Sequence, residues 1–259
     1  MTEAAAQRAY LQAWHDAQPG ATTRAFAAGR IAGGGSSYDL LVQAARGRVL
    51  DLGCGDGLLV ERIAGAVGVD LSAGELALAA RRPGVAGRLV RARADALPIA
   101  TASIDTVVSH LASMLMTPAD AVAGEIARVL APGGRFVAVV GGGPVEPPPP
   151  GDAFAAFLEL VRPAMVALAV PRLGDPRSRS EAGLRALLGP YGLEVVGFAR
   201  HVVELGGAWG PVAEALLSTY GVERLTHEAR EALATALHAQ VGDAPRCAMV
   251  VFLVTATAA

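Results

Sequence analysis

Residues Val49 to Gly57 read V-L-D-L-G-C-G-D-G, and the rest of the chain is organised around this stretch. An apolar run ends in an acidic residue and opens into three glycines at alternate positions, Gly53, Gly55 and Gly57. Glycine tolerates positive φ and lets a ligand lie against the main chain. Apolar residues at helical spacing follow from Leu58 to Ala64, so the amides of the loop lie at a helix N-terminus. The pattern predicts a strand, a cofactor-binding loop and a helix.

Two common glycine-rich loops do not fit this stretch. The dinucleotide fingerprint places its third glycine where this chain has Leu58. A P-loop requires a lysine, and all 22 basic residues of the chain are arginine. The loop instead carries two carboxylates, Asp51 and Asp56, which would repel a pyrophosphate and suit a ligand with a cationic part.

The stretch resembles the first motif of the class I S-adenosylmethionine-dependent methyltransferases, a D-x-G-x-G-x-G loop around the amino acid half of the cofactor. This resemblance implies that S-adenosylmethionine is the cofactor. It also implies that Asp51, Gly53, Cys54 and Gly55 contact it. A glycine-rich turn of another nucleotide-binding fold is the alternative.

Strand and helix patterns alternate from Arg48 onwards, which is typical of a parallel sheet covered on both faces. The predicted strands are 48–52, 66–70, 88–92, 104–110, 135–140, 193–205 and 246–255. The predicted helices between them are 58–64, 73–81 and 118–130. The resemblance implies that the final strand inserts antiparallel. We therefore expect an α/β fold, a seven-stranded, mostly parallel, doubly wound sheet.

Three further motifs follow in the order of the family. G-V-D-L-S at the end of the second strand resembles the ribose motif, so Asp70 and Leu71 are expected at the ribose. A-D-A-L-P resembles the adenine motif, which implies contacts from Asp95, Ala96 and Leu97. The strand 104–110 resembles the fourth motif, which implies that Ser109 and His110 face the sulfonium methyl. Residues 126–139 resemble the small-molecule branch of the family.

The segments outside these motifs are predicted to cover the site. Residues 1–46 are expected to form an N-terminal helical lid, with helices at 2–17, 22–28 and 36–45, and residues 47–259 the methyltransferase domain. A glycine and proline stretch at 141–151 predicts a linker into a helical insertion. Segments 141–180 and 206–242 are interpreted as substrate caps, with helices at 153–170, 181–188, 208–220 and 226–240 and a polar loop at 172–180.

The acceptor pocket is the least specific part of the prediction. Candidate substrate contacts are apolar or aromatic residues: Tyr38, Met114, Phe154, Phe157, Trp209 and Tyr220. Such residues line adaptable pockets, and they also fill ordinary cores. If they line the pocket, the acceptor is a small, fairly apolar metabolite.

His110 is the candidate catalytic residue, since it ends the strand at which the methyl group would be presented. It is either a general base or a packing residue beside the cofactor. His15, His227 and His238 are expected on helix surfaces. No histidine and carboxylate cluster has metal-ligand spacing, so no metal is expected.

The predicted function is methyl transfer to an O, N or C nucleophile of a small molecule. The alternatives are a non-methylating cyclisation or decarboxylation, a non-catalytic binding role, and methylation of a peptide. A net charge of −2 without long arginine runs disfavours nucleic acid. Cys54 and Cys247 do not suggest a disulfide framework, and no apolar run suggests a membrane span. A cytoplasmic location is expected; the sequence does not specify the oligomeric state.

Overall fold

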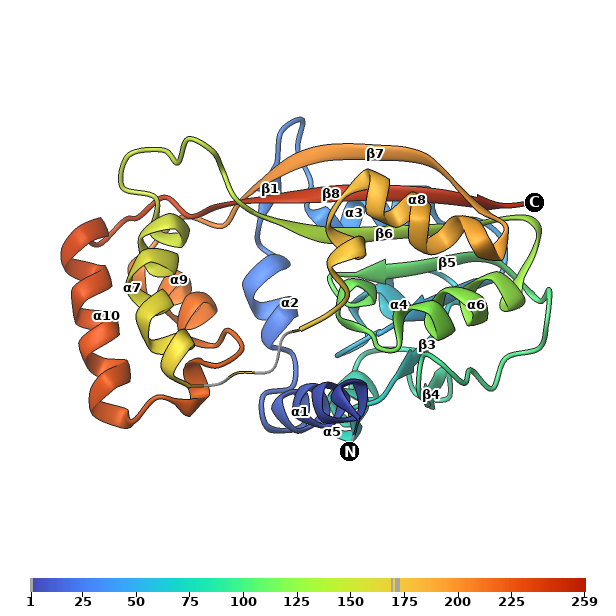
Figure 1. Ribbon diagram of the computed structural model, residues 1–259, viewed down its shortest axis with the longest axis horizontal. Coiled ribbons are helices and arrows are strands. Elements are labelled where there is room, and N and C mark those ends of the chain that lie inside the picture. The colour runs from blue at the N-terminus through green and yellow to red at the C-terminus, as the bar shows by residue number, and fades with distance from the viewer. Residues whose placement is uncertain (1, 169, 171–172) are drawn as a thin grey trace.

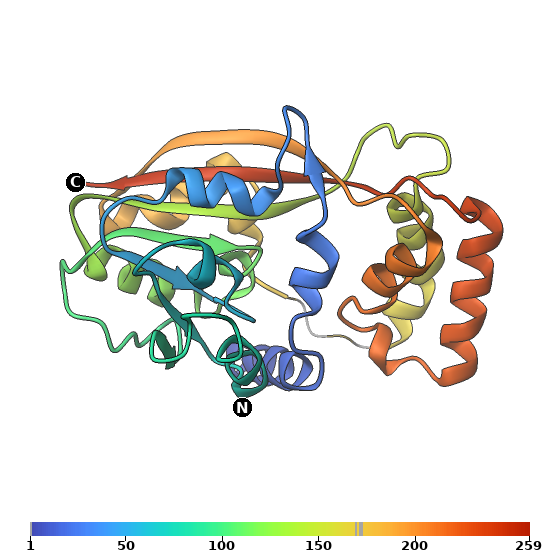
Figure 2. The ribbon, with the colours of Figure 1, turned by 180° about the vertical axis from the view of Figure 1, so that it is seen from behind.

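The computed structural model describes residues 2–168, 170 and 173–259. Within these residues the chain forms an eight-stranded sheet in the order β1-β7-β8-β6-β5-β2-β3-β4 (Figure 1). Three helices, α7 (Ala153–Ala167), α9 (Trp209–Leu217) and α10 (His227–Val241), stand beyond one end of this sheet, and α2 (Ala21–Phe26) lies between them and the sheet (Figure 2). No helix in the described part of the chain is long and apolar enough to cross a membrane.

The parallel half of the sheet contains the strands that carry the motifs. They are β2 (Val49–Leu52), β3 (Val67–Asp70), β4 (Leu89–Arg91), β5 (Ile104–His110) and β6 (Leu130–Pro144). Their connections contain α4 (Leu58–Arg62), α5 (Ala73–Ala79) and α6 (Ala119–Val129). Because parallel strands end at the same edge, the motif residues meet there. The predicted α/β fold is confirmed.

The antiparallel half also follows the prediction in its main feature. β8 (Ala248–Ala258) lies between β6 and β7 (Leu193–Glu204) and is antiparallel to both. The predicted count of seven strands is one short, because β1 (Arg30–Ile31) pairs antiparallel with the edge of β7. A two-residue strand next to glycines leaves no alternating pattern to read.

The predicted linker starts too early. β6 continues through Pro144, with Gly141 opposite Val251 and a register shift between Gly141 and Gly143. A Cβ on Gly142 would lie 2.6 Å from the Phe252 ring, so the irregular residue packs its backbone against an aromatic side chain. Glycine here permits an irregular strand where the sequence pattern suggests a turn.

Helices cover both faces of the sheet. On one face α3 (Ser37–Ala44) and α4 bury Leu41 and Leu59 against the strands. On the other face α6 and α8 (Glu181–Leu188) bury residues such as Ile126 and Leu184. Short 3₁₀ turns complete this part: η1 (Ser113–Leu115), η2 (Pro176–Arg179) and η3 (Gly189–Tyr191).

We call two groups of helices the lid and the cap, one N-terminal and one from residues 153–241. The lid comprises α1 (Glu3–Ala17), α2 (Ala21–Phe26) and α3, and the capping box of α3 is made by Ser36 and Asp39. The cap comprises α7 (Ala153–Ala167), α9 (Trp209–Leu217), η4 (Val222–Arg224) and α10 (His227–Val241). Position 169 of the predicted helix 153–170 and position 172 of the predicted loop 172–180 lie outside the described residues.

Candidate active site

A cavity of about 150 Å³ lies at the carboxyl ends of β2, β3 and β5. We call one wall the floor: Asp51, residues 53–56 of the glycine loop, Asp70 and Asp95. We call the other wall the roof: one face of α1, Gly20, Thr22, Thr23, Tyr38 and Tyr220. The floor and roof are far apart in sequence and meet only in the folded chain.

The glycine loop is held tightly against its neighbours. The N–H groups of Gly53 and Cys54 donate to the carbonyl oxygen of Val69 at 2.8 and 3.1 Å. Gly53 has a φ of +75°, and a Cβ there would lie 2.5 Å from the Cβ of Ala112. A side chain at this position would therefore clash as well as strain the backbone. The loop backbone can approach a ligand closely because these positions are glycine.

Asp51 is the loop carboxylate that lacks a partner. It is 1% exposed, and its Oδ1 has no hydrogen bond to any described residue. Burial, reinforced by the negative charges of Asp70 and Asp56, raises the pKa of Asp51 well above its usual range. A buried, unpartnered carboxylate facing a cavity suits an ammonium group, so the site fits the amino acid part of S-adenosylmethionine.

Asp56 has a different role from the one that the sequence suggested. Its Oδ1 accepts from the Thr23 hydroxyl at 2.6 Å, and its Oδ2 accepts from Arg82 at 2.6 Å. Thr23 belongs to α2, so this carboxylate fastens the lid to the glycine loop. Of the two loop carboxylates, Asp51 is the one left to meet a cation.

Asp70 and Asp95, the residues expected at the ribose and the adenine, both line the cavity. Asp70 accepts the backbone N–H of Gly55 at 2.9 Å and that of Ser72 at 2.8 Å, one at each oxygen. Asp95 accepts from Arg93 at both oxygens, and this pair holds the pKa of Asp95 below its usual range. Leu71, Cys54 and Gly55 also line the cavity.

Three predicted cofactor contacts lie outside the cavity lining: Ala96, Leu97 and Ser109. Leu97 packs in the core, and its N–H donates to Glu125 at 2.6 Å. The Ser109 hydroxyl donates to the Leu52 carbonyl at 2.8 Å and accepts from the Ser113 N–H. Leu97 and Ser109 therefore contact other parts of the protein beside the floor instead of the cavity.

His110 ends β5 inside the cavity. The Tyr38 ring stacks on it at 3.7 Å, and its Nε2 lies 2.9 Å from the Ser37 hydroxyl. Its Nδ1 is buried with no hydrogen-bond partner within the described residues. Burial lowers the pKa of His110 to about 3, so the imidazole is neutral at physiological pH.

The predicted substrate residues divide between two places. Tyr38 and Tyr220 line the cavity. Phe154 and Phe157 are instead buried in the core of the cap, and Trp209 packs against that core. The prediction that Phe154, Phe157 and Trp209 line the substrate pocket is therefore wrong, because the cap helices bury these side chains among themselves.

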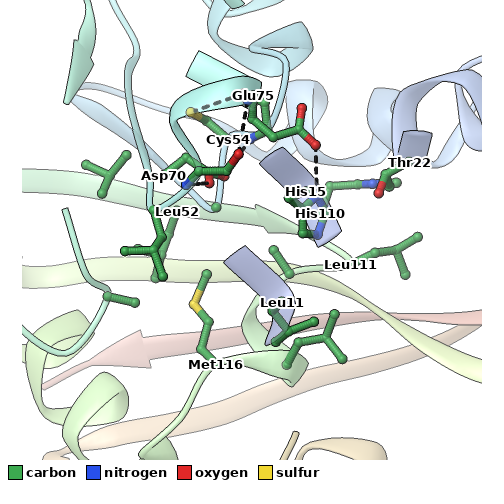
Figure 3. A pocket seen from close by; sticks show the side chains of 18 of the residues that line it. Leu11, His15, Thr22, Leu52, Cys54, Asp70, Glu75, His110, Leu111 and Met116 are labelled. Carbon is green, nitrogen blue, oxygen red and sulfur yellow. Dashed lines mark hydrogen bonds and ion pairs between the residues drawn. The ribbon is translucent and has the colours of Figure 1, made fainter. Parts of the chain in front are cut away.

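Met114 lies outside this cavity as well. Its sulfur accepts from the Gly141 N–H at 3.1 Å, and its neighbour Met116 lines the cavity instead. Met116, Leu11 and Leu111 form an apolar side opposite the polar residues Asp70 and Glu75 (Figure 3). The cavity therefore has one side for a charged ligand and another for an apolar one.

His15 and Glu75 are the functional candidates that sequence reasoning missed. The sequence predicted His15 on a helix surface, but in the structure both ring nitrogens contact other side chains. Its Nδ1 lies 2.8 Å from Glu75 Oε1, and its Nε2 lies 2.9 Å from the Tyr220 hydroxyl. Glu75 is 2% exposed and also accepts the Gly20 N–H at 2.8 Å. A signal existed in α1, because Arg8, Leu11, Gln12 and His15 all line the cavity and share the i, i+3, i+4, i+7 spacing of one helix face.

A metal site is not evident in the described ranges, where no three His, Cys, Asp or Glu side chains are grouped to hold an ion.

Comparisons with known proteins agree with this geometry. Residues 50–138 match the family described as "Methyltransferase domain". The chain is 37% identical over 127 residues to a demethylmenaquinone methyltransferase of Thermus thermophilus, covering 46% of this chain and 56% of the relative. It is 41% identical over 97 residues to a malonyl-[acyl-carrier protein] O-methyltransferase of Methylococcus capsulatus, covering 34% of this chain and 35% of the relative. The chain thus spans about half the length of the first relative and a third of the second.

The fold comparison extends further along the chain than the sequence comparison. A solved structure from Bacillus halodurans C-125, of a protein assigned to the methyltransferases, superposes with a TM-score of 0.58 at 18% identity. It covers 85% of this chain and 98% of that one. Residues 50–138 therefore form a methyltransferase domain, and the chain has the fold of the class I methyltransferases, whose cofactor is S-adenosylmethionine.

Proposed function

We propose that the protein transfers a methyl group from S-adenosylmethionine to an O, N or C nucleophile of a small, fairly apolar molecule. The observation that carries this proposal is Asp51, a buried carboxylate without a partner among the described residues, at the head of the glycine loop. Asp70 and Asp95 also line the cavity; Asp70 ends β3 and Asp95 follows β4, the next two strands of the sheet after β2. We assign the ribose to Asp70 and Leu71 and the adenine end to Asp95.

The cofactor supplies an electrophilic methyl group that is already activated by the sulfonium charge. The protein must then orient the acceptor in line with that methyl group and exclude water. Orientation of this kind contributes about 7 to 11 kcal/mol to lowering a barrier. The lid performs the exclusion, because Thr23 binds the glycine loop through Asp56 and Tyr38 covers His110.

The apolar side of the cavity supports the acceptor class. Leu11, Leu111, Leu115 and Met116 can hold a hydrocarbon or aromatic body beside the donor side. The two relatives act on demethylmenaquinone and on a malonyl thioester carrier, as their names state. We propose an acceptor with an apolar body here, because that side of the cavity is apolar.

We assign His110 a positioning role. An imidazole with a pKa of about 3 accepts a proton poorly near neutral pH, where the best general bases have pKa values near the ambient pH. Its unpartnered Nδ1 can still accept or donate one hydrogen bond to a bound molecule. We also propose a cytoplasmic location, consistent with two buried free thiols, Cys54 and Cys247.

Two measurements test the function. Calorimetry with S-adenosylhomocysteine should give micromolar binding, which Asp51→Asn weakens. Methyl-labelled S-adenosylmethionine is then incubated with a naphthoquinol, a simple phenol, a malonyl thioester and a small peptide. Label in the quinol or phenol supports the proposal, and label in the peptide would replace the acceptor class. Binding with no transfer to any acceptor would instead favour a non-methylating role.

A further inference from the structure

A part-buried chain of hydrogen bonds crosses the roof of the cavity through Glu75, His15 and Tyr220. The three residues come from α5, α1 and the turn after α9, and all three line the cavity. His15 lies 2.8 Å from Glu75 at Nδ1 and 2.9 Å from the Tyr220 hydroxyl at Nε2. Figure 3 shows the Glu75 to His15 contact as a dashed line beside the glycine loop.

The hydrogen-bond roles in this chain follow from its ends. A carboxylate only accepts, so the proton of a neutral His15 lies on Nδ1, directed at Glu75. Nε2 is then an acceptor, and the Tyr220 hydroxyl donates to it. The lone pairs of the Tyr220 oxygen remain available on the cavity side, where they can accept from a hydroxyl of a bound molecule.

The other imidazole of the cavity has a different environment. His110 is stacked under Tyr38, its Nε2 meets a neutral hydroxyl, and its pKa falls to about 3. His15 instead has the Glu75 carboxylate 2.8 Å from its Nδ1 and the Tyr220 hydroxyl 2.9 Å from its Nε2. The two imidazoles therefore differ in their partners, because both nitrogens of His15 are engaged and only one nitrogen of His110 is.

Neighbouring residues hold the Glu75, His15 and Tyr220 side chains in one arrangement. Glu75 is fixed by the Gly20 N–H at its other oxygen, and the Trp14 ring lies 4.5 Å from the Tyr220 ring. Burial and the negative charges of Glu75 and Asp70, with Tyr10 nearby, raise the pKa of Tyr220, so the phenol stays protonated. Tyr220 can pass a proton on only by receiving one at the same time.

We infer that Tyr220 and His15 form a proton relay for an acceptor hydroxyl, with Glu75 as the residue that positions His15. This inference rests on the proposed function and assigns its substrate class: a phenol, quinol or other hydroxyl that must lose a proton. As the acceptor oxygen forms its bond to the methyl carbon, the sulfur to methyl bond breaks. The hydroxyl proton moves to the Tyr220 oxygen, and the Tyr220 proton moves to His15 Nε2. The positive charge lost from sulfur appears on His15 beside Glu75, so charge is conserved.

The first test needs no acceptor. Nitrogen-15 histidine spectra of the protein bound to S-adenosylhomocysteine should show His15 protonated at Nδ1 and bare at Nε2. Tyr220→Phe should shift the Nε2 signal. Spectra of the His238→Gln variant serve as the control, because His238 forms an exposed pair with Asp243 on α10. A proton on Nε2 of neutral His15 would overturn the inference, since that nitrogen could not then accept.

The second test uses the acceptor that takes up label in the transfer assay. His15→Gln should lower the single-turnover rate about 10²- to 10⁴-fold and remove its rise with pH. The KM for S-adenosylmethionine should change less than threefold, and Tyr220→Phe should behave alike. Added imidazole should partly restore His15→Ala but not Tyr220→Phe. Glu75→Gln should lower the rate less than His15→Gln does.

The outcomes separate the two proposals. Cofactor binding with no methyl transfer to any acceptor removes the proposed function. Transfer to a hydroxyl with an unchanged rate and pH profile in His15→Gln removes the relay alone. Transfer only to a carboxylate, which has no proton to lose at neutral pH, also removes the relay and leaves the methyltransferase function intact.

Discussion

The floor and the roof of the cavity are built by different means. The floor consists of strand ends and a glycine loop, held by backbone hydrogen bonds such as those of Gly53 and Cys54 to Val69. The roof is held by side chains from distant parts of the chain, as in the pairs His15 with Tyr220 and Tyr10 with Glu223. Backbone hydrogen bonds leave the floor little freedom to change shape, whereas contacts between side chains in the roof can break and form again. We therefore expect the floor to set cofactor affinity and the roof to set access and proton transfer.

The largest effect is expected at Gly53 in the floor. Gly53→Ala should lower the free energy of unfolding by about 2 to 5 kcal/mol, because a positive φ and a clash with Ala112 act together. Urea unfolding measures this. Gly87→Ala is the matched control: its φ is +86° and no described heavy atom lies within 4 Å of the added Cβ. It should cost only about 1 to 2 kcal/mol, and equal losses would contradict the packing argument.

Asp51→Asn should weaken S-adenosylhomocysteine binding about 10- to 100-fold, since a hydrogen bond to a charged group contributes about 1.5 to 3 kcal/mol. Burial raises the pKa of Asp51, so its ionised form destabilises the fold as pH rises through that pKa. The variant should therefore unfold at a higher temperature than the wild type at neutral pH.

Calorimetry and thermal unfolding measure the two effects of Asp51→Asn. Asp105→Asn is the control, since Asp105 pairs with exposed Arg48 at the opposite end of the sheet strands. It should leave binding unchanged and lower stability. Unchanged affinity in Asp51→Asn would remove this carboxylate from the cofactor site.

His110, where floor and roof meet, should make the fold sensitive to acid. Its pKa is about 3 when folded and 6.5 when exposed, so the unfolded chain takes up the proton first as pH falls. The neutral imidazole contributes stability fully above pH 6.5, and this stability is lost as pH falls toward 3. The loss should reach about 1.4 kcal/mol for each pH unit in that window. Urea unfolding of His110→Gln at several pH values should show a shallower decline, and parallel curves would contradict the prediction.

The smallest effects are expected at two contacts between the lid and the cap, those of Tyr10 and Arg24. Tyr10→Phe removes a 2.7 Å hydrogen bond to Glu223 and should cost about 1 kcal/mol in unfolding free energy. Arg24→Gln breaks a largely exposed pair with Glu214 and should cost less than about 0.5 kcal/mol. Both substitutions should speed release of S-adenosylhomocysteine while changing the free energy of unfolding only by these small amounts. Stopped-flow displacement measures the release rate. Release at the wild-type rate would mean that these two contacts do not control access to the cavity.

The floor could be predicted because its signals are local. Asp51 and Asp70 lie at the carboxyl ends of β2 and β3, and Asp95 lies in the loop after β4. Parallel strands bring these ends together without further information. The antiparallel last strand was expected from the resemblance to the family. The two-residue β1 and the irregular end of β6 were not, since their pairing depends on β7 and β8.

The roof could not be predicted in the same way. His15 is separated from Glu75 by 60 positions and from Tyr220 by 205. Only the packing of three elements brings them within hydrogen-bond distance, and nothing in their local sequence specifies it. Phe154 and Phe157 illustrate the converse problem, because an aromatic residue near a site pattern can equally satisfy the core of a neighbouring lobe.

The long antiparallel strands have one more consequence. β6 and β8 run from the sheet centre into the base of the cap, where Asp152 links α7 to the backbone of Ala248. The glycine loop and Asp70 are carried by β2 and β3, which do not pair with β6 or β8. Exchange of the two segments 145–180 and 205–247 for those of another such protein should thus leave the floor intact. It should change the roof, because Tyr220 and Glu223 lie in the second segment and contact α1.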